Sequence, residues 1–73
     1  MSFRSLAECL VDLGEPVMSD WAKFDRPAQL HVGFQALHLF EKEKGRLPMP
    51  KSEEDAAELL GLCEKVLGTL KGI

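Results

Sequence analysis

Two histidines and two cysteines are the side chains of this sequence best suited to chemistry. His31 and His38 lie seven residues apart in the segment RPAQLHVGFQALHLF, which is otherwise mainly apolar. In a helix this spacing separates their backbones by about 10.5 Å, whereas a zinc–nitrogen bond measures about 2.0–2.1 Å. Histidine pairs that bind zinc from one helix stand three or four residues apart. We therefore expect structural or interface histidines here, and no metal site.

The cysteines, Cys9 and Cys63, are 54 residues apart, and neither belongs to a C-x-x-C motif. A reactive cysteine needs an accessible, electropositive setting, whereas a buried one behaves as a small apolar residue. Each cysteine has an acidic neighbour, Glu8 or Glu64, which disfavours the thiolate. The pattern predicts packing cysteines and no catalytic nucleophile.

The run SEEDAAE carries three consecutive acidic residues, Glu53, Glu54 and Asp55, after Ser52. It lacks the alternating oxygen ligands and the glycine of a calcium loop. Acidic residues behind a serine cap are typical of a solvated helix start. With no glycine-rich phosphate loop in the chain, we predict no catalytic, cofactor-binding or metal-binding residue.

The apolar periodicity and the punctuation of the sequence predict an all-α fold, a partial helical bundle in a single segment, residues 1–73. Two longer helices are expected over about 26–44 and 53–70, after a short one over about 5–13, with loops over 14–25 and 45–52. Residues typical of helix ends flank them, namely a Ser5–Glu8 capping box and Gly14, then Asp25, Pro27 and Gly45, then Ser52. Between the first two helices, Val17 and Met18 indicate a brief extended run, and Trp21 and Phe24 are expected to be core anchors rather than partner-binding hot spots.

The second helix is apolar over an unusually wide arc. At 100° per residue its apolar positions cover roughly 220°, whereas a helix covered on one side needs about 100°. His31, Gln35 and His38 share the remaining polar strip. We expect more cover for this helix than the other two supply. The residues expected to carry the core are Leu30, Phe34, Leu37, Phe40, Leu59, Cys63 and Leu67.

Composition excludes several classes of function. The net charge is −3 and the nine basic residues are scattered, so no face is built for nucleic acid. No apolar run reaches the eighteen or so residues of a membrane span, and the first residues lack a secretory signal. We expect a cytoplasmic and nuclear chain with reduced thiols, binding neither nucleic acid nor membrane.

The chain resembles a segment of the eukaryotic ubiquitin-activating enzymes over most of residues 3–60. The matching residues are Phe3-Arg4-Ser5-Leu6, Ser19-Asp20, Ala22-Lys23-Phe24, Arg26-Pro27-Ala28-Gln29-Leu30-His31, Gly33-Phe34-Gln35-Ala36-Leu37-His38, Phe40, Pro48 and Glu54-Asp55-Ala56-Ala57-Glu58-Leu59. Trp21 departs from the pattern, in which phenylalanine is usual, and the likeness fades beyond Leu60.

The resemblance implies the start of the four-helix bundle inserted in the inactive adenylation domain. It implies a parent enzyme that uses ATP and magnesium to adenylate ubiquitin, carries it as a cysteine thioester and passes it to a conjugating enzyme. It also implies that the nucleotide site and the catalytic cysteine lie outside this segment, so neither Cys9 nor Cys63 inherits that role. The partners are then the other domains of the parent and, through the parent, ubiquitin and conjugating enzymes.

We therefore predict a non-catalytic structural segment of a ubiquitin-activating enzyme, itself needing no cofactor. A free-standing helical module that binds a partner protein is the alternative, and a helix-turn-helix DNA-binding protein is a third possibility. We also expect the isolated chain to be weakly stable, or to self-associate through its second helix.

Overall fold

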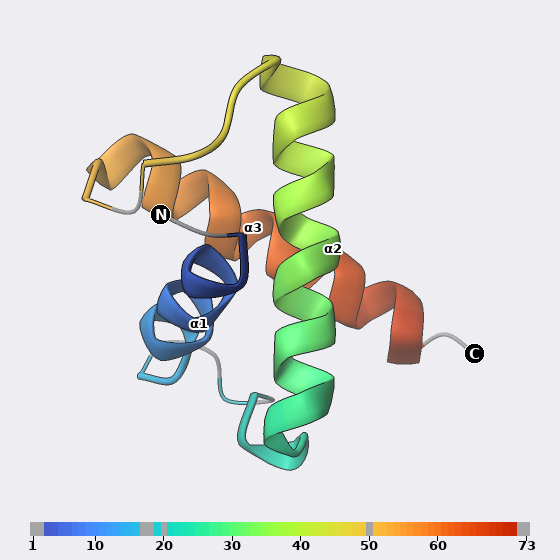
Figure 1. Cartoon of the computed structure of the whole chain (residues 1–73). Coiled ribbons are helices and arrows are strands. Elements are labelled where there is room, and N and C mark those ends of the chain that lie inside the picture. The colour runs from blue at the N-terminus through green and yellow to red at the C-terminus, as the bar shows by residue number, and fades with distance from the viewer. Residues whose placement is uncertain (1–2, 17–18, 20, 50, 72–73) are drawn as a thin grey trace.

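The structure is a computed structural model that describes residues 3–16, 19, 21–49 and 51–71, with the backbone alone at residues 70 and 71. Its described part consists of three α-helices, α1 (Phe3–Gly14), α2 (Arg26–Lys44) and α3 (Glu53–Lys71), with a short 3-10 helix, η1 (Trp21–Lys23), and no strand (Figure 1). The predicted all-α class is confirmed. The predicted extended run at Val17 and Met18 lies outside the described residues.

Helix α1 begins earlier than its capping signal indicated. The helix starts at Phe3, so Ser5 lies inside its first turn and cannot be the N-cap. The Glu8 carboxylate accepts instead from Arg4, with 3.2 Å between Arg4 Nε and Glu8 Oε1. The predicted capping box is therefore wrong, because Ser5 and Glu8 both lie inside a helix that begins at Phe3.

Helix α2 is capped as the sequence predicted. Asp25 has extended backbone, and its Oδ1 accepts a hydrogen bond of 3.0 Å from the Ala28 N–H. Pro27 lies in the first turn, where a missing N–H costs nothing. At the other end Gly45 adopts φ 72°, a left-handed conformation that glycine reaches without strain, and donates to the Glu41 carbonyl.

The start of α3 is anchored by Ser52. Its Oγ accepts from the Asp55 N–H at 3.4 Å, while its carbonyl accepts from Ala56 at 2.9 Å. Glu53, Glu54 and Asp55 occupy the first turn, where negative charge opposes the positive end of the helix dipole.

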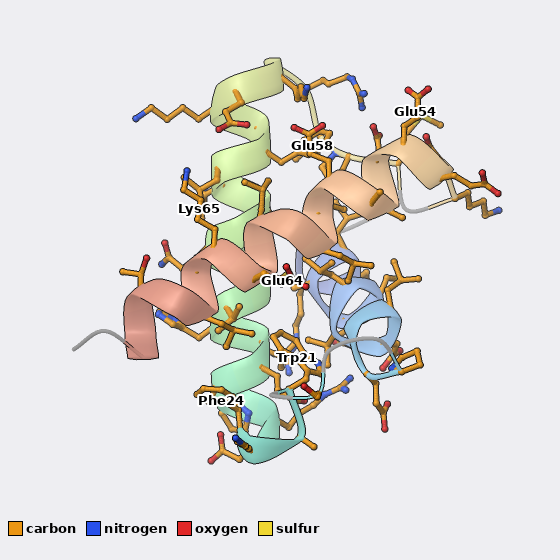
Figure 2. All side chains as sticks on the ribbon, turned by 180° about the vertical axis from the view of Figure 1, so that it is seen from behind. Trp21, Phe24, Glu54, Glu58, Glu64 and Lys65 are labelled. Atoms are coloured by element: carbon orange, nitrogen blue, oxygen red, sulfur yellow. The ribbon has the colours of Figure 1, made fainter. Side chains whose placement is uncertain are left out.

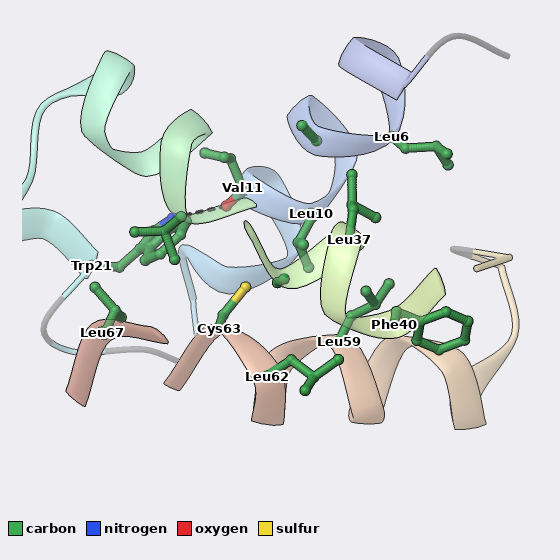
Figure 3. Close-up of a cluster of buried hydrophobic side chains, with 13 residues drawn as sticks. Leu6, Leu10, Val11, Trp21, Leu37, Phe40, Leu59, Leu62, Cys63 and Leu67 are labelled. Atoms are coloured by element: carbon green, nitrogen blue, oxygen red, sulfur yellow. Dashed lines mark hydrogen bonds between the residues drawn. The ribbon is translucent and has the colours of Figure 1, made fainter. Parts of the chain in front are cut away.

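The three helices pack around one core, with α2 in the middle. Figure 1 shows α3 crossing α2 steeply on one side, while α1 lies along a neighbouring side. Figure 3 shows the buried side chains that meet between them. The buried apolar residues are Leu6, Ala7, Leu10, Val11, Trp21, Val32, Ala36, Leu37, Phe40, Leu59, Leu62, Cys63 and Leu67. Of the residues expected in the core, Leu30 and Phe34 are half-buried against this cluster and the other five belong to it.

The wide apolar arc of α2 is largely covered within this chain. Helix α1 crosses α2 at Gly33, where the Ala7 carbonyl oxygen lies 3.4 Å from the position that a Cβ would take. Helix α3 covers the side that contains Phe40, and His31, Gln35 and His38 remain exposed. Leu30, Phe34 and Leu39 on this arc stay half-buried, so the expectation that two helices supply too little cover is met in part. Helices α1 and α3 pack against different sides of α2, so together they cover a wider part of its apolar arc than either helix alone.

Trp21 closes the open end of the core. It is 1% exposed, and its Nε1 donates a hydrogen bond of 3.1 Å to the Val11 carbonyl at the end of α1 (Figure 3). Gln29 of α2 donates through Nε2 to the carbonyls of Trp21 and Phe24, at 2.8 and 3.1 Å. Trp21 is thereby tied to both helices and Phe24 to α2, with Trp21 as a fully buried anchor and Phe24 as a half-buried one.

Candidate functional site

The two histidines do not form a common site. His38 packs its ring against Phe3 of α1, with the ring centroids 4.9 Å apart, and Phe3 stacks on Phe34 at 5.8 Å. His31 lies further along the exposed strip and lines a hollow between α2 and α3. His38 thus contacts α1, whereas His31 borders the hollow beside α3.

The two cysteines differ in environment. Cys63 is 1% exposed in the core, and burial, with a smaller contribution from the Glu64 charge, raises the pKa of its thiol to about 12. Cys63 is therefore protonated at neutral pH and unsuited to nucleophilic attack. Cys9 is half-buried at the edge of α1 and has a free thiol.

The strongest polar cluster joins the end of α2 to the start of α3. Arg46, just after the Gly45 cap, forms a two-bonded pair with Asp55, at 2.8 Å from Nη1 to Oδ2 and 3.0 Å from Nη2 to Oδ1. The Met49 N–H donates to the same Oδ2 at 2.8 Å. The Arg46 guanidinium also lies over the Phe40 ring, 5.3 Å from its centroid. We call these four residues the Arg46–Asp55 clamp.

The Arg46–Asp55 clamp corrects the sequence interpretation of the acidic run. Asp55 is 6% exposed, whereas a solvated residue was expected. The Arg46 hydrogen bonds, followed by that from the Met49 backbone, lower the pKa of Asp55 from 3.8 to about 2. An ionised carboxylate with these donors is a fixed structural acceptor. The sequence interpretation missed this role because Asp55 stands among exposed acidic residues. In the helix Asp55 points inward, whereas Glu53 and Glu54 remain exposed.

Shallow hollows lie on the surface of the described residues. One, of about 240 Å³, lies between α2 and α3 and is lined by His31, Gln35, Val66 and Thr69. Another, of about 310 Å³, is lined by Cys9, Asp12 and Leu13 of α1 and by Lys51, just before α3.

Neither metal-binding clusters nor membrane spans emerge from the described residues. No three His, Cys, Asp or Glu side chains among them are placed to hold a metal ion. None of the described helices combines the length and the apolar character that a membrane crossing requires. The described residues form three α-helices packed around one apolar core, which defines the class of the molecule, a segment of a helical bundle.

Comparison with known proteins identifies the bundle. A protein-family model described as the ubiquitin-activating enzyme E1 four-helix bundle matches residues 1–67. The chain belongs to this family and is the four-helix-bundle region of a ubiquitin-activating enzyme.

The curated relatives are much longer than this chain. It is 56% identical over 68 residues to the human protein "Ubiquitin-like modifier-activating enzyme 1", an alignment that covers 90% of this chain and 6% of the relative. It is 46% identical over 66 residues to "Ubiquitin-activating enzyme E1 1" of Arabidopsis thaliana, with the same coverage. It is 44% identical over 72 residues to "Ubiquitin-activating enzyme E1 1" of Schizosaccharomyces pombe, covering 97% of this chain and 7% of the relative. No solved structure matches the chain significantly.

Proposed function

We propose that this chain is a non-catalytic structural segment of a ubiquitin-activating enzyme. The family match over residues 1–67 carries the proposal. The environments of the buried chemical groups support it, since Asp55 is engaged by Arg46 and Met49 while Cys63 is held protonated in the core. In this role the three helices form a rigid support, and the other domains of the parent enzyme are the partners.

For the parent enzyme we propose the activity that the family name describes. It would use ATP and magnesium to adenylate ubiquitin, carry ubiquitin as a cysteine thioester and deliver it to a conjugating enzyme, in the cytoplasm and the nucleus. The described residues of this chain do not fit either ATP or magnesium, because they offer no acidic cluster for the ion and no glycine-rich loop for phosphates. No step of that reaction is therefore assigned to them.

Reading the gene on both sides of residues 1–73 tests the structural role directly. Adenylation-domain sequence in the same frame upstream and downstream is the expected result. Stop codons at both ends would contradict the proposal and would favour a free-standing helical interaction module.

A ubiquitin-loading assay tests the absence of catalysis. The chain is incubated with ubiquitin, ATP and magnesium, and adducts are separated on gels with and without a thiol reductant. We expect no reductant-sensitive adduct, because the Cys63 thiol is protonated and buried. A ubiquitin thioester that Cys9→Ser abolishes would overturn the proposal.

A further inference from the structure

The serine that precedes α3 is followed directly by three carboxylates. Glu53, Glu54 and Asp55 stand at the first, second and third positions after Ser52. Serine kinases that select acidic substrates bind carboxylates at these positions with basic side chains, while the serine hydroxyl faces the γ-phosphate of ATP. Glu53 and Glu54 are exposed, and Figure 2 shows Glu54 projecting away from the start of α3. The surroundings of Ser52 therefore match the substrate of an acid-directed serine kinase.

The hydroxyl of Ser52 is held more weakly than its backbone. Its Oγ accepts from the Asp55 N–H at 3.4 Å, which is long for a hydrogen bond, and the residue is half-buried. Its backbone N–H donates to the Met49 carbonyl at 2.9 Å, and its carbonyl accepts from the Ala56 N–H at 2.9 Å. The hydroxyl is thus the least constrained polar group of this helix cap, and it is the group that a phosphoryl transfer uses.

The third carboxylate is engaged by the Arg46–Asp55 clamp. Asp55 accepts two hydrogen bonds from Arg46 and one from the Met49 N–H, and it is buried. A kinase binds the residues around its acceptor serine in an extended form, so the first turn of α3 has to open before transfer. Asp55 cannot serve the kinase and Arg46 at the same time. The clamp therefore controls the access of a kinase to Ser52.

We propose that Ser52 is a phosphorylation site for an acid-directed serine kinase, and that the Arg46–Asp55 clamp limits the rate of its modification. In the transfer the Ser52 O–H bond breaks and Oγ bonds to the γ-phosphorus of ATP. The bond from that phosphorus to the bridging oxygen breaks, ADP leaves, and the hydroxyl proton passes to the base of the kinase. The inference does not rest on the proposed function.

The phosphate and the clamp oppose each other after the transfer as well. A phosphoserine carries a charge of about −1.5 to −2 at neutral pH. At Ser52 this charge repels the Asp55 carboxylate and competes with it for Arg46. Phosphorylation would thus loosen the charged junction between α2 and α3.

The experiment incubates the folded 73-residue chain with ATP, magnesium and casein kinase 2, a kinase that selects acidic residues after the serine. Intact mass counts the phosphates, and peptide-resolved mass spectrometry locates them. We expect a single phosphate on Ser52 and none on the variant Ser52→Ala. Ser5 is the control within the chain, because it has only one carboxylate, Glu8, among the three residues that follow it and lies inside α1. It should stay unmodified.

A matched pair of variants tests the role of the clamp. Arg46→Gln removes the paired cation of the clamp, whereas Lys44→Gln removes the neighbouring Lys44–Glu58 ion pair, 3.2 Å long, and leaves the clamp intact. Arg46→Gln should be phosphorylated about tenfold faster than the parent chain, since the loss of charge-assisted hydrogen bonds makes local opening more frequent. Lys44→Gln should react at the parent rate. Circular dichroism checks that both variants are folded.

A synthetic peptide of residues 47–58 supplies the reference without a clamp, and it serves if Arg46→Gln unfolds. The peptide should be phosphorylated at least as fast as Arg46→Gln and faster than the parent chain. Absence of phosphate from both peptide and chain, or phosphate on another serine of the chain, would overturn the site. Equal rates for the peptide, the parent chain and folded Arg46→Gln would overturn the control by the clamp.

Discussion

The contacts that α2 makes with α1 and with α3 are of two different kinds. The α1–α2 crossing depends on close apolar contact, with Gly33 against Ala7 and with Trp21 sealing the end of the core through one buried hydrogen bond. The α2–α3 junction shares the core but ends in the charged Arg46–Asp55 clamp. The α1–α2 contact depends on the fit of apolar side chains, so it should be sensitive to substitutions that change side-chain volume. The α2–α3 contact depends in addition on the ionisation of Asp55, so it should also be sensitive to pH.

The largest expected effect is at Trp21. Replacing this fully buried side chain, Trp21→Ala, removes its packing and its hydrogen bond to Val11, a class of change that costs about 3–5 kcal/mol. A core of this size rarely supplies more than about 3–5 kcal/mol in total, so the variant should be largely unfolded at 25 °C by circular dichroism. Phe24→Ala, at a half-buried position, is the milder control. A Trp21→Ala variant that melts within a few degrees of the parent chain would show that the crossing does not depend on this anchor.

The next effect separates the two contacts by pH. Asp55 has a folded-state pKa of about 2, below its ordinary 3.8, so its ionised form stabilises the folded chain above about pH 4. That stabilisation should disappear as the pH falls from about 4 to about 2. Thermal melts of the parent chain and Asp55→Asn should therefore differ at pH 5–7 and converge near pH 2.

Glu54→Gln is the control for this titration, since Glu54 lies in the same turn and is exposed. Its melting temperature should stay close to that of the parent chain throughout the range. An equal difference between Asp55→Asn and the parent chain at pH 2 and pH 7 would contradict an ionised clamp.

The smallest effects come from two glycines that differ in their neighbours. A leucine at Gly33 meets the Ala7 backbone, so Gly33→Leu should lower the free energy of unfolding by about 1–3 kcal/mol through overpacking. Gly61 has no neighbouring atom within 4 Å of the Cβ position, so Gly61→Leu should raise the free energy of unfolding by up to about 1 kcal/mol through its higher helix propensity. Urea unfolding of both variants measures the difference. Equal effects at the two positions would mean that the close approach of α1 and α2 does not constrain Gly33.

Local signals in the sequence predicted much of the fold. Asp25 and Gly45 act at the ends of α2 through bonds to residues three or four positions away, and Pro27 acts through its missing N–H, all of which the sequence displays directly. The cap predicted at Ser5 was wrong because the S-x-x-E motif is also a local signal. The motif does not show that the helix begins two residues earlier, at Phe3. The short helix at Trp21–Lys23 was not predicted, since its anchor is the distant Val11 carbonyl.

The amino-acid sequence by itself determined the helical class, most helix ends, the apolar nature of α2 and the family. Each of these follows from residue type and periodicity along the chain. The tertiary structure decided that α1 and α3 together cover most of the apolar arc of α2, that Asp55 turns inward to Arg46, and that a hollow opens beside Cys9 and Leu13. These features depend on the directions in which three helices cross, and helical periodicity identifies an apolar face without identifying its neighbour.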